Sequence, residues 1–232
     1  FRRVLFRSLL NMPKQYFSYE DFLELVEVYM TYLMSQKASL SDTLLYESVY
    51  AVEQALEAYV NRKFVEKMAK KSSARDSESP AIDSIADETM YRVVENKRPN
   101  LEYYKNNSIS FFIPAAYTAM AILEKDAFQF STGDLHKTYN FLQDFFQNEF
   151  ARDVDKTPEH YVRKTIKTFI DEAVIMPHRT LPDTYNLTSA GFRKLKLFAS
   201  FLKTFFESYW IVLNFFMRHH PKELGPKERL KK

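Results

Sequence analysis

The stretch Tyr185-Asn186-Leu187-Thr188-Ser189-Ala190-Gly191 contains the change from strand to helix on which the predicted fold depends. Residues 184–187 predict a short strand, because they are β-prone and follow a Pro-rich tip at residues 177–183. A partner strand is expected at residues 174–176, before that tip. Thr188 is a favourable N-cap residue and predicts that a long last helix begins there and runs to about residue 219.

The same stretch resembles the strand-to-helix step of winged-helix domains, commonly written Y-x-L-T-x-x-G. Helix starts precede it along the chain, at Thr132 and at Thr157-Pro158-Glu159, where a capping hydroxyl is followed by Pro and an acid. A further short strand is expected near residues 90–94. We therefore predict a mainly α chain, a multi-helix assembly with a minimal winged-helix-like β element.

Two helices are expected to form a hairpin over residues 9–68. The first begins at Ser18, and the second at Ser41 and Asp42. Their apolar residues recur at helical spacing, namely Phe22, Leu25, Val26, Tyr29, Met30 and Leu33 in the first, and Leu45, Val49, Val52, Leu56, Val60, Phe64 and Met68 in the second.

The rest of the chain divides by composition. Residues 69–88 are rich in Ser and mixed charges and predict a flexible linker, followed by a helical C-terminal domain at 89–220 and a basic tail at 221–232. The apolar run 109–123 predicts a buried helix that is kinked or broken at Pro114. No internal repeat is evident.

Composition excludes several kinds of site. The 3 Gly residues are isolated, which excludes a glycine-rich phosphate loop, and the absence of Cys excludes disulfides, thiolate zinc sites and cysteine nucleophiles. His219 and His220 have no partner ligands at helical spacing. We therefore expect no metal and no cofactor.

His178 and Asp183 form an H-x4-D pattern. In acyltransferases this spacing pairs an imidazole base with the carboxylate that orients it. Here both residues lie in an expected Pro-rich tip, which is a poor place for a catalytic pair. We interpret the pattern as fortuitous and assign no catalytic residue in this chain.

The last part of the chain is basic and apolar. From Thr188 onward there are ten Lys or Arg and three Glu, although the net charge of the whole chain is only +3. The polar residues of the last helix form one narrow stripe, so the helix is either buried in a core or pressed into a lipid interface, and burial in a core is the favoured interpretation. If it meets a membrane, the expected contacts are Phe201, Phe205 and Trp210.

The first eight residues do not look like part of a natural protein. Arg3-Val4-Leu5-Phe6-Arg7-Ser8 resembles the translation of a sequencing-library adapter, so residues 1–8 are interpreted as a non-native scar. We expect the coding sequence proper to begin near Leu9, within a longer protein.

Several segments together resemble the C-terminal region of the bacterial membrane-bound glycerol-3-phosphate acyltransferase. The segments are Leu9-Leu10-Asn11-Met12-Pro13, Leu101-Glu102-Tyr103-Tyr104-Lys105-Asn106-Asn107 with the apolar helix after it, Tyr185 to Gly191, and Phe206-Glu207-Ser208-Tyr209-Trp210-Ile211-Val212.

The resemblance implies a parent enzyme that transfers an acyl group from acyl carrier protein or coenzyme A to the 1-hydroxyl of glycerol 3-phosphate, in phospholipid synthesis. It implies a peripheral location at the cytoplasmic face of the bacterial inner membrane, and a catalytic domain upstream of this chain. This chain would then be inactive alone, pack on that domain and help seat it on an anionic membrane surface.

Two other functions remain open from the residues. A winged-helix-like module would bind duplex DNA in a salt-dependent way, although the chain lacks the strong basic excess of DNA-binding proteins, so nucleic acid is not the expected partner. A plain helical scaffold would bind neither DNA nor lipid.

Overall fold

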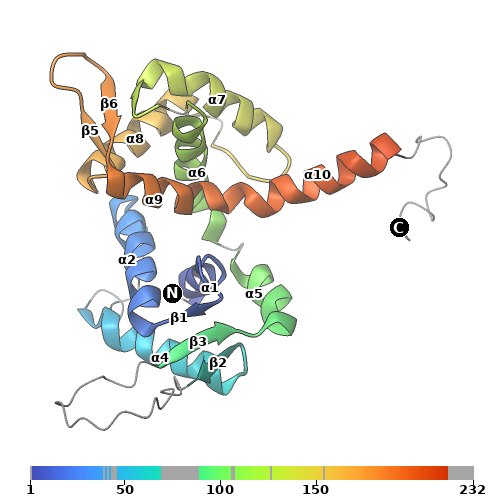
Figure 1. Ribbon diagram of the computed structural model, residues 1–232. Helices are drawn as coiled ribbons and strands as arrows, with labels where there is room; N and C mark the ends of the chain where they lie inside the picture. The colour runs from blue at the N-terminus through green and yellow to red at the C-terminus, as the bar shows by residue number, and fades with distance from the viewer. Residues whose placement is uncertain are drawn as a thin grey trace, which may run out of the picture. The chain divides into compact units, whose positions relative to one another are not determined.

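The computed structural model describes residues 2–38, 40, 42, 46–68, 89–105, 108–125, 127–153 and 155–218. The chain forms two compact units, Phe1–Phe111 and Phe112–Lys232, each with its own three-stranded sheet (Figure 1). Helices account for most of the described residues, which confirms the mainly α class.

The first unit carries a small antiparallel sheet of order β1-β3-β2 among its helices. Its elements are α1 (Arg2–Leu10), β1 (Tyr16–Phe17), α2 (Tyr19–Ser35), α4 (Ser48–Asn61), β2 (Val65–Met68), β3 (Met90–Val93), a short 3-10 turn (Glu95–Lys97) and α5 (Arg98–Lys105). Helix α1 packs against α2 and α5.

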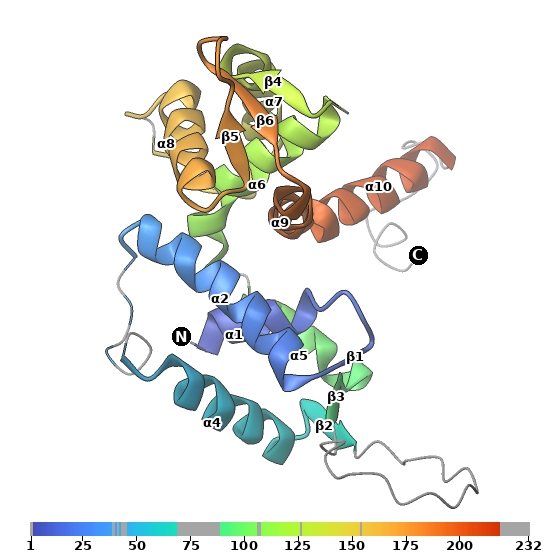
Figure 2. The same cartoon turned by 60° about the vertical axis from the view of Figure 1, so that its left-hand side comes forward.

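The second unit carries a sheet of order β4-β6-β5, seen in Figure 2 beside α7 and α8. Its elements are α6 (Ile109–Glu124, whose first turn precedes Phe112), β4 (Gln129–Ser131), α7 (Thr132–Phe145), α8 (Pro158–Asp171), β5 (Ile175–Pro177), β6 (Thr184–Leu187), α9 (Ser189–Ala199), a 3-10 turn (Ser200–Leu202) and α10 (Lys203–Arg218). The expected strands near 90–94, 174–176 and 184–187 are confirmed as β3, β5 and β6.

The two units repeat one arrangement. Among the described elements of each unit, a helix, a strand, two helices and two strands succeed one another in that order, and the third strand lies between the first two. This is the winged-helix arrangement, present twice. The prediction of no internal repeat is therefore wrong. The repeat lies in the order of the helices and strands and in the pairing of the strands, and few residues are identical between the two units.

The repeat extends to individual residues. Phe17 pairs with Tyr91 in one sheet and Phe130 with Tyr185 in the other, with ring centroids 6.0 and 6.1 Å apart. The residue after each Phe is a Ser that forms a capping box with the Asp three positions on, at Ser18 and Ser131. Each box satisfies backbone N–H groups at the start of the following helix.

The turn from the third helix to the second strand is also repeated. Lys63 and Ala173 adopt φ values of 57° and 53°. Next to them, Phe64 N–H donates to the Tyr59 carbonyl and Val174 N–H to the Phe169 carbonyl, at 2.9 and 2.8 Å. A left-handed residue closed by such a hydrogen bond ends a helix and reverses the chain.

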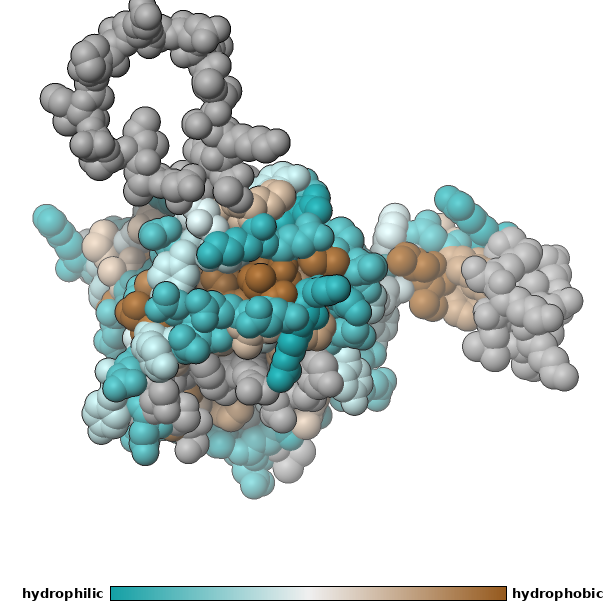
Figure 3. All heavy atoms as spheres, turned by 90° about the horizontal axis from the view of Figure 1, so that it is seen from below, coloured by the Kyte–Doolittle hydropathy of each residue, from teal (hydrophilic) through white to brown (hydrophobic). Residues whose placement is uncertain are grey.

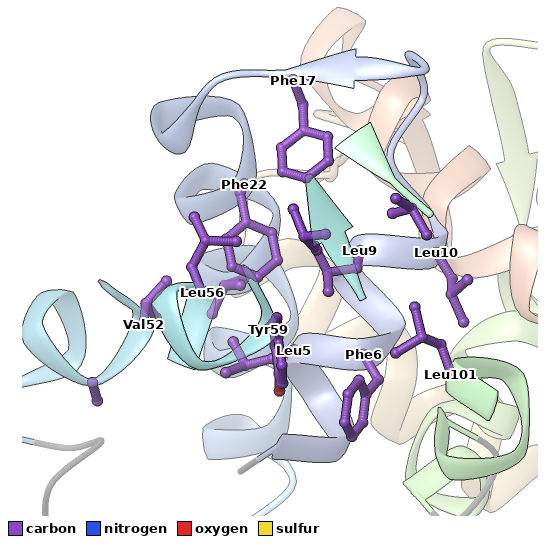
Figure 4. Close-up of a cluster of buried hydrophobic side chains, with 14 of the residues drawn as sticks. Leu5, Phe6, Leu9, Leu10, Phe17, Phe22, Val52, Leu56, Tyr59 and Leu101 are labelled. Atoms are coloured by element: carbon purple, nitrogen blue, oxygen red, sulfur yellow. The ribbon is translucent and has the colours of Figure 1, made fainter. Parts of the chain in front are cut away.

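Large aromatic and aliphatic side chains fill both cores. In the first unit they come from four helices and all three strands (Figure 4) and include Leu9, Phe17, Phe22, Val26, Val52, Leu56, Tyr59, Val65, Val93 and Leu101. In the second they include Phe112, Tyr117, Phe130, Leu135, Tyr139, Phe146, Val162, Ile166, Phe169, Val174, Phe198 and Phe201. The whole apolar stripe expected for the helix after Ser18 is buried.

The second helix of the expected hairpin was predicted too long. Helix α4 ends at Asn61, and residues 65–68, of which Met68 was assigned to the helical stripe, form β2 instead. The left-handed Lys63 ends the helix, and pairing with β3 decides the extended conformation of residues 65–68. The expected helix start at Ser41 lies outside the described residues.

Two further expectations differ from the structure. Of the kink or break expected at Pro114, the break is wrong, because α6 continues through Pro114, whose carbonyl accepts a hydrogen bond from Thr118 Oγ1 at 2.8 Å. The C-terminal domain was expected from residue 89, whereas β3 pairs with β1 and β2, so residues 89–111 group with the first unit.

The outermost and linking segments are only partly covered. The predicted linker at 69–88 and the predicted tail at 221–232 lie outside the described residues. Residues 2–10 form α1, whose side chains from Val4 to Leu10 are buried. The prediction that residues 1–8 are foreign concerns the origin of the DNA, so packing does not test it.

The start of α9 leaves no room for a side chain at Gly191. A Cβ there would lie 2.7 Å from the carbonyl carbon of Val174 and 2.8 Å from Thr188 Oγ1. We expect Gly191→Ala to lower the free energy of unfolding by about 2–4 kcal/mol. At Gly133 the nearest atom would be 3.8 Å away, so Gly133→Ala should raise stability by roughly 0.5 kcal/mol. Urea unfolding of both variants checks this, and a Gly191→Ala protein as stable as Gly133→Ala would contradict it.

Candidate functional site

The end of β6 positions the helices that come after it in the chain. Thr188 Oγ1 accepts a hydrogen bond from Gly191 N–H at 2.8 Å and lies 2.9 Å from the Ala173 carbonyl oxygen, to which it donates. One hydroxyl thus caps α9 and ties it to the turn before β5. The predicted cap is confirmed, and the single long helix it was expected to start is divided into α9 and α10 by the 3-10 turn Ser200–Leu202.

A buried carboxylate lies at the same junction. The Glu172 side chain is 6% exposed, and its two carboxylate oxygens accept no hydrogen bond within the described residues. Lys194 Nζ lies 4.0 Å from Glu172 Oε2 and donates to the Glu172 backbone carbonyl at 3.3 Å. Burial raises the pKa of Glu172, Lys194 partly opposes this, and Asp171 adds to it.

The first half of α10 is anchored by aromatic contacts. The rings of Phe205 and Phe206 lie 4.7 Å from Phe150 and 5.0 Å from Phe146, centroid to centroid. Tyr209 also packs on Phe146, and its hydroxyl donates to Glu149 at 3.1 Å. Partial burial and this hydrogen bond raise the pKa of Tyr209.

The second half of α10 is exposed, so the favoured expectation of a helix buried in a core is wrong for this part. Helix α10 has no buried residue, and six of its large apolar side chains are between 43% and 83% exposed: Trp210, Ile211, Val212, Leu213, Phe216 and Met217. In Figure 3 this helix projects at the right with apolar side chains on its surface. Exposed apolar surface of this kind marks a site of interaction with a partner or a membrane.

The polar side chains of α10 are largely satisfied within the helix. Ser208 Oγ and Asn214 Nδ2 each donate to the carbonyl four residues earlier, at 2.8 Å. Lys203 and Glu207 form an i, i+4 ion pair at 3.7 Å. A helix whose polar groups are paired internally loses less when water around it is replaced by an apolar phase.

The three residues expected to contact a membrane lie in different places. Phe201 is 1% exposed and packs 4.6 Å from Phe112, so its side chain belongs to the core. Phe205 is partly buried against Phe146 and Phe150, and Trp210 is 68% exposed. The exposed residues after Trp210 were missed, because the sequence pattern does not tell where the neighbouring α7 ends.

No hydrogen bond or ion pair joins the side chains of His178 and Asp183 in the described part of the chain. His178 Nδ1 accepts hydrogen bonds from the backbone N–H groups of Thr180 and Leu181 at 3.2 and 3.1 Å. Nδ1 used as an acceptor carries no hydrogen, so it is not the ring atom that could donate to a carboxylate. Asp183 lies in the turn before β6 with a φ of 49°, and its backbone carbonyl accepts a hydrogen bond from Thr132 N–H.

Two features are absent from the part of the chain that the structure describes. No helix there is long and apolar enough to cross a membrane. No group of three or more His, Asp or Glu side chains there could hold a metal ion.

Comparison with known proteins identifies one family. The family model for the C-terminal region of glycerol-3-phosphate acyltransferase matches residues 7–232. No curated protein and no solved structure matches the chain.

Replacement of the buried Glu172 should change stability in a pH-dependent way. A carboxyl whose pKa is raised on folding binds its proton more tightly in the native state, so the native state loses stability as the pH rises from about 4 through that raised pKa. Glu172→Gln removes this loss. We expect its Tm to exceed that of the wild type by a few degrees at pH 8, with the difference shrinking toward pH 4. The exposed Glu207→Gln serves as control, and a Glu172→Gln protein less stable at every pH would contradict the prediction.

Proposed function

Because this chain belongs to the family of glycerol-3-phosphate acyltransferase C-terminal regions, we propose that it is a non-catalytic part of such an enzyme and helps hold it on a membrane surface. The exposed apolar half of α10 is the observation that carries the proposal. The upstream catalytic domain would supply the acyl transfer to glycerol 3-phosphate, from acyl carrier protein or acyl-coenzyme A. The location would be peripheral, at the cytoplasmic face of the bacterial inner membrane.

The energetics of α10 suit weak, reversible membrane binding. Full burial of a large apolar side chain is worth roughly 1.5–3 kcal/mol, so half-burial of the six exposed side chains would give on the order of 5 kcal/mol. That is close to the strength of a single short acyl anchor, which needs a second attraction for stable binding. The basic residues after Thr188 would provide it on an anionic surface.

Trp210 allows a direct test, since it is the only Trp of the chain and lies in the exposed half of α10. Addition of anionic phospholipid vesicles should shift its emission to shorter wavelength and carry the protein upward in a flotation gradient. Binding should weaken at high salt and on purely zwitterionic vesicles, because part of the attraction is electrostatic.

Substitution of the exposed apolar residues of α10 should weaken vesicle binding. The triple change Trp210→Ala, Leu213→Ala and Met217→Ala should reduce vesicle binding roughly 100- to 200-fold, at about 1 kcal/mol for each side chain. The double change Phe128→Ala and Tyr103→Ala removes two aromatic side chains that are also strongly exposed, and should leave binding unchanged. Equal binding by the triple variant and the wild type would refute a role of α10 at the membrane.

Nucleic-acid binding is the second candidate, and the observed winged-helix arrangement favours it. In such domains the third helix reads the duplex, and here that helix is α8, which exposes Arg163, Lys164 and Lys167. The same preparation titrated with duplex DNA separates the two functions. Salt-dependent DNA binding without vesicle binding would favour this second candidate.

A further inference from the structure

The third helices of the two units, α4 and α8, occupy equivalent places. Each is followed by the same left-handed turn, so residues 110 positions apart correspond, as Lys63 does to Ala173. The correspondence holds for the buried positions, which are Val52, Leu56 and Tyr59 in α4 and Val162, Ile166 and Phe169 in α8. The outward positions of the two helices therefore correspond as well.

The outward positions carry opposite charge. Glu53, Gln54 and Glu57 of α4 correspond to Arg163, Lys164 and Lys167 of α8, and all six side chains are exposed. No ion pair engages any of these charges within the described part of the chain. The same helix position in the same fold tolerates either sign, so the stability of the unit does not require the basic face of α8.

The acidic face of α4 borders a groove. Tyr19, Glu53, Leu56, Glu57, Val60, Asn61, Lys67 and Tyr91 line a cavity of about 550 Å³. Burial is the main cause that raises the pKa of Tyr19 and of Tyr91. The second cause is the negative charge of a nearby carboxylate, which is Glu53 for Tyr19 and Glu57 for Tyr91. Figure 3 looks onto the first unit from below and shows apolar side chains in a strip between hydrophilic ones.

The chemistry of the groove suits long cationic side chains. The lining carries two negative charges, from Glu53 and Glu57, and one positive charge, from Lys67. Its two phenol rings can face a cation, and Leu56 and Val60 can cover the apolar stems of Lys or Arg. The cations of α8 match it in spacing. Lys167 comes four positions after Arg163, and Glu57 comes four positions after Glu53, which is a rise of about 6 Å in either helix.

We propose that these two faces bind each other between copies of this chain, with α8 of one copy against the groove beside α4 of another. In an antiparallel arrangement Arg163 would face Glu57, and Lys167 would face Glu53. The cations of α8 cover only about 6 Å of helix, with Glu159 and Asp171 beyond them, which fits a compact acidic surface better than a long polyanion.

The contact should be weak and sensitive to salt. Exposed ion pairs each contribute little and are screened, so we expect a dissociation constant of roughly 0.1–1 mM at low ionic strength and at least tenfold weaker binding at about 0.5 M salt. Analytical ultracentrifugation of the whole chain between about 50 μM and 1 mM measures this directly.

Charge reversal provides the decisive test. The variant Glu53→Lys with Glu57→Lys has two basic faces, and the variant Arg163→Glu with Lys167→Glu has two acidic faces. Each alone should stay monomeric, and an equimolar mixture should associate again. Glu24→Lys with Glu124→Lys makes the same charge change on exposed positions that do not line the groove and should associate as the wild type does. Circular dichroism confirms that each variant is folded.

Every other outcome overturns the proposal. A wild-type chain that is monomeric at all concentrations contradicts it, as does a mixture that fails to associate. Association that is lost in the Trp210→Ala, Leu213→Ala and Met217→Ala variant would assign self-association to α10 instead. Duplex DNA binding abolished by Arg163→Glu with Lys167→Glu, without self-association, would assign the basic face to nucleic acid. None of these outcomes depends on vesicle binding, so this proposal and the proposed function fail separately.

Discussion

Both units depend on a third strand that is hydrogen-bonded on its two sides. β6 lies between β4 and β5, and its end runs directly into Thr188, whose hydroxyl caps α9 and bonds to the turn before β5. The backbone of Val174 is packed so closely against Gly191 that no side chain fits between them. The direction in which α9 leaves the sheet is thus set by hydrogen bonds and contact, and the course of α10 depends on that direction.

From this start, α10 is half anchored and half exposed. Its first turns pack on the aromatic end of α7, whereas the side chains from Trp210 onward extend past any covering element of their unit in the described chain. A helix with this division is held rigidly at one end and offers an apolar surface at the other. That is a suitable geometry for attaching a folded region to a second surface, which in our proposal is a membrane.

The repeated unit separates what the fold needs from what it does not need. Capping boxes at Ser18 and Ser131, the Phe–Tyr cross-strand pairs and the left-handed turn residues occur in both units, because each satisfies the backbone or fills the core. The outward charges of α4 and α8 are free of these demands and are opposite in sign. Such positions are open to interactions with a partner, and in our proposal the two faces bind each other.

Local chemistry by itself determined the helix starts at Ser18, Thr157 and Thr188, the buried stripe of α2 and three of the six strands, because caps, periodicity and turn residues act over a few positions. The family resemblance also came from sequence segments alone. Only the tertiary structure decided that residues 65–68 leave the helix to pair with β3, that Phe201 is buried while Trp210 is exposed, and that the fold is repeated. Each of these features depends on contacts between residues far apart in the chain, and a short sequence pattern does not reveal such contacts.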